Sequence, residues 1–225
     1  MKKKSEYQSV FISDLHLGTK LCQDDKLLEF LKSFETEQLF LVGDAIDLWS
    51  LNRQYYWSKT QTEILRRILK ISEKSSVYYL LGNHDESFRK VIAHNNLGME
   101  VFGQIFIKNE HHYSALDGSH ILVTHGDQWD LSMKIPRFFF TLTDYLFSFL
   151  PKPKLEALTT FANRITSTQS VATRFVEKNE RFDAVLMGHT HIPKKTDKYL
   201  NCGDWVTNCS YLTEDLDGQW NLNFF

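Results

Sequence analysis

The sequence predicts an α/β fold in which parallel strands alternate with helices and a second sheet follows. Short apolar runs alternate with segments of helical period up to residue 85. Further on, Asp-Gly pairs at 117–118 and 217–218 separate alternating segments and indicate hairpins. Several apolar runs end in glycine or serine followed by Asp, Asn or His. Parallel sheets bind ligands at the carboxyl ends of their strands, so these polar residues mark where a site should form.

The composition is that of one globular domain. The chain has 225 residues, 42% of them hydrophobic, and we expect a single domain over residues 1–225. A net charge of −2 argues against a nucleic-acid partner, because such proteins usually carry a strong basic bias. Cys22, Cys202 and Cys209 form no Cys-x-x-Cys pair, and we interpret them as reduced thiols.

The first nine residues indicate the cellular compartment of the protein. Residues 1–4 begin with three lysines after Met, as at the start of a signal peptide. Residues 5–9 are polar, so the apolar core of such a peptide is missing and we expect a cytoplasmic protein.

The first strand is predicted over residues 9–12 and is followed by Asp14 and His16. Two positions apart in an extended segment, their side chains point the same way. The alternative is a turn aspartate beside a surface histidine, because short Asp-x-His matches are frequent. A helix should follow, with Asp24 as its cap and apolar residues at helical spacing, namely Leu27, Leu28, Leu31 and Phe34.

The apolar residues 39–42 indicate a short buried strand that Gly43 ends. Asp44 follows at its carboxyl end. A carboxylate has two oxygens and can bridge two cations, so we predict that Asp44 bridges a two-metal site. Asp47 either orients a metal ligand from behind or caps the next segment, and we favour the first. Residues 49–57 are aromatic and irregular, and we expect a loop beside the site.

A second helix is predicted around residues 64–71 and a third strand over 76–81, which ends in Gly-Asn-His-Asp. Asn83 offers a neutral oxygen ligand. His84 ionises near neutral pH, and Asp85 is placed to hold its tautomer. The alternative is an ordinary Asn-rich turn.

Alternation predicts antiparallel strands over residues 104–108 and 113–117, with 119–124 as the strand that returns after an Asp-Gly turn. His125, in the sequence His-Gly-Asp, follows that strand. The tail, residues 199–225, should form short strands. The change from strand–helix units to hairpins indicates a second sheet.

The stretch 130–180 differs in kind and is predicted to be a helical insertion within the domain. Residues 135–150 are apolar around most of a helical circumference, yet shorter than the roughly 18 to 20 residues that span a bilayer. Two interpretations stay open, a helix buried in the domain and a lid with an apolar surface for a lipid or membrane. The strand that follows, 182–187, ends in Gly-His-Thr-His and presents His189 and His191 on one side.

Each motif alone is weak, but the ordered set is specific. Asp-x-His, Gly-Asp-x-x-Asp, Gly-Asn-His-Asp, His-Gly-Asp and Gly-His-x-His follow one another, each after a predicted strand. This order resembles the calcineurin-like metallophosphoesterases over residues 14–191. The resemblance implies a four-layer α/β/β/α sandwich. It also implies two metal ions, one held by Asp14, His16, Asp44 and His191, the other by Asp44, Asn83, His125 and His189.

The chemistry of these donors agrees with the resemblance. Two cations about 3.5–4 Å apart can clamp a phosphoryl group, acidify a water and stabilise the leaving oxygen. Asp, Asn and His donors without Cys suit Mn²⁺ best, with Fe or Zn²⁺ as alternatives. In the family, the counterpart of His84 contacts phosphate and is a candidate proton donor with Asp85 behind it. His84 and Asp85 are therefore the predicted catalytic residues.

Within the family, the length, the Phe-rich insertion and the sequence Ile-Ser-Asp-Leu-His-Leu-Gly resemble bacterial UDP-2,3-diacylglucosamine hydrolases. Those enzymes cleave a pyrophosphate bond in lipid A synthesis, and their helical lid holds acyl chains. Leu48 and Asp85 stand where protein phosphatases of the family carry Arg and Glu. His84 stands where many of the hydrolases carry Arg, and this departure bears on the substrate.

The resemblance implies a dinuclear-metal phosphoester hydrolase that acts on a nucleotide-linked lipid. On the lid interpretation of the apolar helix, the protein would also contact the inner membrane peripherally. A phosphodiesterase or phosphatase for a soluble nucleotide is the alternative within the same class. A scaffold that has lost catalysis is the alternative of another class. The filled ligand positions and His84 oppose the scaffold.

Overall fold

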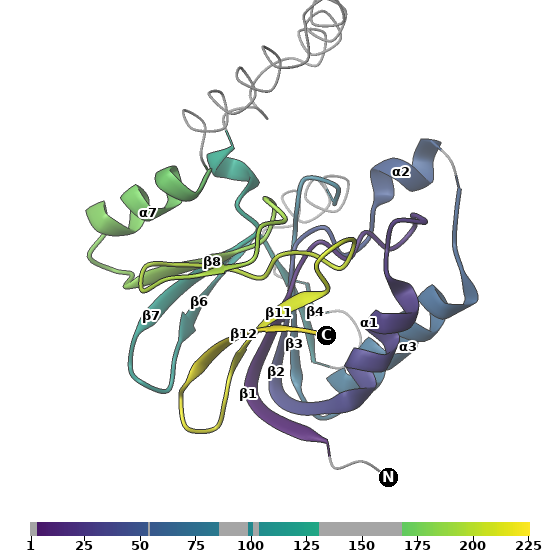
Figure 1. Ribbon diagram of the computed structural model, residues 1–225, viewed down its shortest axis with the longest axis horizontal. Coiled ribbons are helices and arrows are strands. Elements are labelled where there is room, and N and C mark those ends of the chain that lie inside the picture. The colour runs from purple at the N-terminus through teal and green to yellow at the C-terminus, as the bar shows by residue number, and fades with distance from the viewer. Residues whose placement is uncertain (1–3, 54, 86–98, 101–103, 131–167) are drawn as a thin grey trace, which may run out of the picture.

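The computed structural model of the chain describes residues 4–53, 55–85, 99–100, 104–130 and 168–225. Two β-sheets face each other, and helices cover their outer faces (Figure 1). The layers run helix, sheet, sheet, helix, so the predicted α/β/β/α sandwich is confirmed.

The larger sheet has seven strands, four of which run parallel. In spatial order they are β12 (Trp220–Phe224), β11 (Ser210–Glu214), β1 (Ser5–Ile12), β2 (Phe34–Val42), β3 (Ser76–Leu80), β5 (Ile105–Lys108) and β4 (Met99–Glu100). Alternation predicts antiparallel pairing for residues 104–108, and β5 pairs antiparallel with β4 but in parallel with β3. The prediction holds for one neighbour only, because alternation reports which faces of a strand are buried and carries no information about the direction of its partner.

The smaller sheet has five strands and begins with the predicted hairpin. In spatial order they are β6 (Glu110–Ser114), β7 (His120–Thr124), β8 (Ala184–Met187), β10 (Tyr199–Asn201) and β9 (Lys194–Lys195). The turn between β6 and β7 contains Gly118 with φ +88°, a conformation that glycine adopts without steric cost. The second sheet and the hairpin turns at Gly118 and Gly218 are confirmed.

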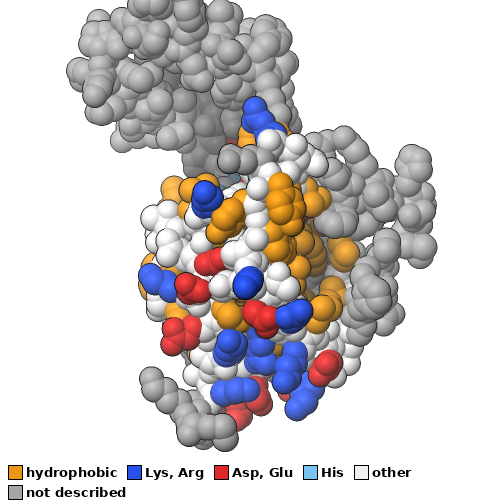
Figure 2. Space-filling view, turned by 90° about the vertical axis from the view of Figure 1, so that its right-hand side faces the viewer, with side chains coloured by type: hydrophobic (Ala, Val, Ile, Leu, Met, Phe, Trp, Pro, Cys, Tyr) orange, Lys and Arg blue, Asp and Glu red, His pale blue; other side chains and the backbone are white. Residues whose placement is uncertain are grey.

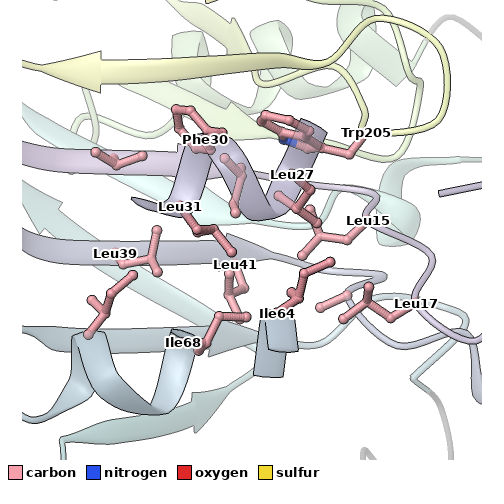
Figure 3. Close-up of a cluster of buried hydrophobic side chains, with 14 of the residues drawn as sticks. Leu15, Leu17, Leu27, Phe30, Leu31, Leu39, Leu41, Ile64, Ile68 and Trp205 are labelled. Atoms are coloured by element: carbon pink, nitrogen blue, oxygen red, sulfur yellow. The ribbon is translucent and has the colours of Figure 1, made fainter. Parts of the chain in front are cut away.

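Helices α1 (Asp24–Ser33) and α3 (Lys59–Ser72) pack on the outer face of the larger sheet and bury one apolar stripe each (Figure 3). The predicted cap of α1 is wrong, because Gln23 precedes the helix and Asp24 is its first residue. The Asp24 carboxylate instead accepts a hydrogen bond of 2.7 Å from Ser58, whose hydroxyl caps α3. The two helix starts are thereby tied together.

Successive residues of each central strand face different layers. Val10 and Ile12 of β1 contact the helices, whereas Phe11 lies between the sheets. In β2, residues 39 and 41 lie on the helix side and Phe40 on the other. Strand geometry explains this, since the side-chain period is two. Burial on both faces makes each strand a continuous apolar run and stabilises the fold by about 1.5–3 kcal/mol per large side chain.

The remaining helices lie near the strand ends. Residues 49–57 are predicted as an irregular loop, but α2 occupies Leu48–Arg53, so the prediction is wrong over its first half. A short 3₁₀ helix, η1 (Asp127–Trp129), follows β7. Within the predicted helical insertion, α7 (Thr168–Lys178) is observed and packs on the smaller sheet.

The rest of the predicted insertion, residues 131–167, lies outside the described residues. Among the helices that the structure describes, none is long and apolar enough to cross a membrane.

Candidate metal centre

Seven predicted donor side chains lie at the carboxyl ends of strands from both sheets. Asp14 and His16 follow β1, Asp44 follows β2 and Asn83 follows β3. His125 follows β7 of the smaller sheet, and His189 and His191 follow β8. Backbone hydrogen bonds join these ends in pairs, from Asp14 N to Gly43 O (3.1 Å) and from Gly188 N to His125 O (3.1 Å).

The backbone at this edge adopts a rare conformation. Six non-glycine residues in the described part of the chain have positive φ, and five of them are predicted metal ligands. They are Asp14 (φ 54°), His16 (48°), Asp44 (51°), His189 (64°) and His191 (56°). Left-handed geometry is uncommon for residues with a side chain and tends to collect at functional sites. It turns each donor inward directly after its strand ends.

Glycines make room for the donors. A Cβ atom on Gly43 would overlap the His125 ring, and one on Gly82 would overlap the Asp44 carboxylate. At Gly188, an added Cβ would overlap Ser13 Oγ and crowd Asp14 Oδ2. The glycines of Gly-Asp, Gly-Asn-His-Asp and Gly-His-x-His therefore allow the close approach of neighbouring strand ends.

Asp14, His16 and His191 form one group that could hold a metal ion. His191 Nε2 lies 3.2 Å from Asp14 Oδ1, and His16 Nε2 lies 3.9 Å from the same oxygen. Asp14 Oδ2 accepts hydrogen bonds from the Ser13 hydroxyl and from His189 N. Its Oδ1 is buried without a hydrogen-bond partner. A buried carboxylate oxygen that accepts no hydrogen bond and faces two imidazole nitrogens is the arrangement that a bound cation would satisfy.

Asp14, Asp44 and His125 form a second such group. Asp44 Oδ2 lies 3.3 Å from His125 Nε2. His125 Nδ1 lies 2.9 Å from the Val42 carbonyl oxygen, to which it can only donate, so Nε2 of the neutral ring keeps its lone pair for a metal. Asn83 Oδ1 lies 3.3 Å from His125 Nε2 and completes this side of the site.

His189 joins the second group through Asn83. Its Nδ1 lies 3.1 Å from Asn83 Oδ1, and its Nε2 lies 2.8 Å from Asp130 Oδ2. All seven predicted donors are thus brought into one continuous cluster. Oxygen and nitrogen donors without sulfur fit two divalent cations of intermediate hardness.

Charge in the cluster raises the pKa of two histidines. Burial alone would lower the pKa of His125, but the adjacent Asp44 carboxylate raises it to about 10. At His191 too, burial would lower the pKa, but the adjacent Asp14 carboxylate raises it to about 10. Negative charge therefore predominates in the cluster and attracts either protons or metal ions.

His84 lies at the border of the cluster, beside Asp47. Its Nδ1 is 3.0 Å from Asp47 Oδ1, and Asp47 Oδ2 is 3.2 Å from His16 Nδ1. Asp47 Oδ1 also accepts a hydrogen bond of 2.7 Å from Ser50 N at the start of α2. Asp47 thus lies behind both histidines, as predicted for an orienting residue. Burial lowers and Asp47 raises the pKa of His84, with a net increase.

The position predicted for Asp85 is wrong. Its Oδ2 accepts hydrogen bonds from Asp44 N (2.9 Å) and Gly82 N (3.1 Å), and its Oδ1 accepts one from Tyr79 (2.6 Å). Asp47, not Asp85, contacts the His84 ring. Asp85 turns back beneath the strand because two backbone N–H groups there need an acceptor. It fixes the backbone of Asp44.

Sequence reasoning missed two acidic residues next to the donors. Asp130 contacts His189, and Asp204 Oδ2 lies 3.7 Å from His191 Nδ1. Asp204 is fully buried and accepts hydrogen bonds from Val206 N (2.7 Å) and the Asn208 side chain (2.6 Å). The sequence Cys-Gly-Asp-Trp over 202–205 follows a strand as the other motifs do, and this signal could have identified Asp204.

A sandwich of this topology with a cluster of Asp, Asn and His donors where both sheets end defines a metal-dependent hydrolase of phosphoesters. The chain belongs to the calcineurin-like phosphoesterase family, whose profile matches residues 8–193. The scaffold alternative is disfavoured by this membership together with the complete donor cluster.

Curated relatives share a more specific name. A UDP-2,3-diacylglucosamine hydrolase from Shewanella sp. (strain MR-7) is 25% identical over 94% of this chain and 95% of its own length. The protein of that name from Shewanella sp. (strain ANA-3) is 26% identical over the same shares. Among solved structures, a Pseudomonas putida nuclease matches with a TM-score of 0.36 and 12% identity, covering 96% of this chain and 88% of the nuclease.

Proposed function

We propose that this protein hydrolyses the diphosphate bond of UDP-2,3-diacylglucosamine in lipid A biosynthesis. The observation that carries the hydrolytic part is the complete Asp, Asn and His cluster, in which the buried Asp14 Oδ1 accepts no hydrogen bond and faces the rings of His16 and His191. The relatives named for this substrate match over nearly their whole length and support its identity. The reaction would add water across the diphosphate and give UMP and an acylated glucosamine 1-phosphate.

We assign the donors as the resemblance implies. Asp14, His16, Asp44 and His191 would hold one ion, and Asp44, Asn83, His125 and His189 the other. When bound, two divalent ions would neutralise the phosphate oxygens and lower the pKa of a water. Mn²⁺ is the proposed metal, since the donor set mixes carboxylate, amide and imidazole without thiolate.

His84 is the proposed proton donor to the leaving oxygen. Its side chain is 25% exposed, whereas that of His125 is fully buried, so a substrate can reach His84. Asp47 Oδ1 lies 3.0 Å from Nδ1, and although burial lowers the pKa of His84, Asp47 gives it a net increase, which favours the protonated ring that a proton donor needs. Asp85 acts indirectly, because its carboxylate accepts a hydrogen bond from the backbone N–H of Asp44.

The lipid part of the proposal rests on the sequence. Phe139, Leu146 and Leu150 form one stripe of the helix predicted over 136–150, while a second stripe is also apolar. These residues lie outside the described part of the chain. If one stripe faces the metals, it would bury acyl chains at about 0.8 kcal/mol per CH₂ and bring the enzyme to the surface of the inner membrane.

Hydrolysis of a substrate panel tests the proposal. Mn²⁺-loaded protein should release UMP from UDP-2,3-diacylglucosamine faster than it cleaves dinucleoside polyphosphates or cyclic dinucleotides. The double variant Phe139→Ser, Leu146→Ser should raise KM for the acylated substrate and spare a short phosphodiester. Equal losses on both substrates, or unfolding, would assign the stripe to the core and remove the support for a lipid.

A soluble nucleotide is the second candidate substrate. The residue at position 84 favours it, because His84 stands where many lipid-cleaving relatives carry Arg. In that case a dinucleoside polyphosphate or cyclic dinucleotide would be the best substrate of the panel, and acyl chains would give no advantage.

A further inference from the structure

A pocket of about 620 Å³ lies next to the metal centre, within the size range of small-molecule sites. One wall is α2 with the residues after it, and the other is the loop that follows β1. The side chains that matter here are Lys20, Leu21, Trp49, Arg53, Tyr55 and Tyr56.

Both walls are fixed to residues of the metal centre. On the loop side, Thr19 N donates a hydrogen bond of 3.2 Å to His16 O. On the helix side, Ser50 N donates to Asp47, and the Trp49 ring lies edge-on to the His84 ring with 5.8 Å between centroids. A group bound in this pocket would therefore extend from a phosphate held beside His84.

The loop wall is held rigid as well. The fully buried Gln61 of α3 accepts a hydrogen bond from Gly18 N (3.1 Å) and donates one to Thr19 O (2.9 Å). This wall is therefore held in place before a ligand binds, which lowers the entropic cost of binding.

The lining combines aromatic rings with cations. The Arg53 guanidinium lies 4.7 Å from the Trp49 ring centroid, and Lys20 Nζ lies 5.6 Å from that of Tyr56. Tyr55 is 79% exposed and Leu21 64% exposed. Figure 2 shows hydrophobic side chains gathered in the upper part of the face that carries the helices of the larger sheet. Large aromatic rings exposed beside an active site favour a planar ligand.

We propose that this pocket binds the nucleoside end of the substrate, with the base stacked on the aromatic rings around Tyr55 and the phosphate next to it contacted by Arg53 and Lys20. The inference rests on the proposed function in taking the substrate to be nucleotide-linked. An acyl chain would not use the two cations, and an acidic peptide would not use the rings. A base carrying a phosphate uses both.

Calorimetry on the Mn²⁺-loaded protein tests this with three ligands: UMP, ribose 5-phosphate and dodecyl phosphate. Wild type should bind UMP more tightly than ribose 5-phosphate. Tyr55→Ala should weaken UMP binding about tenfold or more and leave ribose 5-phosphate unchanged, because only the base stacks. Arg53→Gln should weaken both. Phe224→Ala removes an aromatic ring that is 61% exposed on β12 and should change neither.

Two results would overturn the proposal. One is a Tyr55→Ala variant that affects UMP and ribose 5-phosphate equally or not at all. The other is a variant that loses affinity for dodecyl phosphate alone, which would assign the pocket to an acyl chain. These titrations involve no turnover. Base-specific UMP binding without cleavage of UDP-2,3-diacylglucosamine would thus reject the proposed substrate, while the assignment of the pocket to a nucleoside would stand.

Discussion

His84 combines a carboxylate at one ring nitrogen with a side chain that is 25% exposed. The buried rings around it, such as His125, have both nitrogens engaged by other groups of the site. Side chains that transfer protons must meet the substrate, whereas metal ligands must be shielded from competing water. The exposure of His84 suits proton transfer and the burial of His125 suits a metal ligand, whereas the predicted ligand His191 is 40% exposed, so its assignment rests on its contact with Asp14.

Replacing His84 tests its role directly. His84→Asn should keep both metals and lower turnover by about 10² to 10⁴, the usual contribution of a positioned acid. The loss should shrink for substrates with acidic leaving groups, which need little protonation. Turnover measured against leaving-group pKa, with metal content determined in parallel, would show this. Equal losses across the series would indicate that His84 binds phosphate.

Protons and metals should compete for the same histidines. Asp44 and Asp14 raise the pKa values of His125 and His191 to about 10 despite the burial of both rings. In the metal-free protein at neutral pH, both rings are therefore positively charged, with a proton on each nitrogen. A metal binds only the neutral ring. Apparent Mn²⁺ affinity should therefore rise from pH 6 to pH 9 with release of protons. Titrations in buffers of different ionisation enthalpy measure the number released, and pH-independent affinity would contradict the prediction.

At the scale of elements, the site depends on how closely strand ends approach. The end of β8 lies against the end of β1, where His189 N donates to Asp14 Oδ2 (2.9 Å) and Gly188 has no side chain to intervene. One of the contacts between the two sheets at the metal centre thus depends on the missing side chain of Gly188.

Gly188→Ala should weaken metal binding more than folding. The added methyl group would overlap Ser13 Oγ, so Asp14 must shift, and a shift of a few tenths of an ångström spoils metal geometry. Mn²⁺ affinity should fall at least tenfold while the circular dichroism spectrum stays native. Gly118→Ala is the control. Its φ of +88° strains an alanine by roughly 1 kcal/mol, yet nothing lies within 4 Å of the added atom. If both variants bind Mn²⁺ alike, the clash is relieved without moving Asp14.

The packing of the elements also explains which features the sequence could predict. Buried strands and the donors after them are encoded locally, so Asp14, Asp44 and His125 could be located from apolar runs and their ends. The direction of β5 and the contacts of Asp85 depend on partners brought by tertiary packing. Asp204 has a local signal, but its contact with His191 arises only when separate loops meet.

For the molecule as a whole, the metal centre joins the two sheets. Asp14 and Asp44 belong to the larger sheet, and His125, His189 and His191 to the smaller one. The core between the sheets is apolar, but at this end it gives way to the buried carboxylates of Asp14 and Asp44. Without metal ions these carboxylates face the protonated rings of His125 and His191, and keeping such ion pairs buried costs free energy.

Divalent metal should therefore raise the thermal stability of the whole domain. A ligand that binds only the folded state at 100 times its Kd stabilises it by about 2.7 kcal/mol, or about 5 to 10 °C in a domain of this size. Calorimetric melting with Mn²⁺ and after chelation would measure the shift. Asp44→Asn, which leaves an amide where the bridging carboxylate lies 3.3 Å from His125, should lose most of the increase and most of the activity. An unchanged Tm after complete chelation would show that the sheets hold together independently of the metals. A full increase in Asp44→Asn would show that Asp44 is not the bridge.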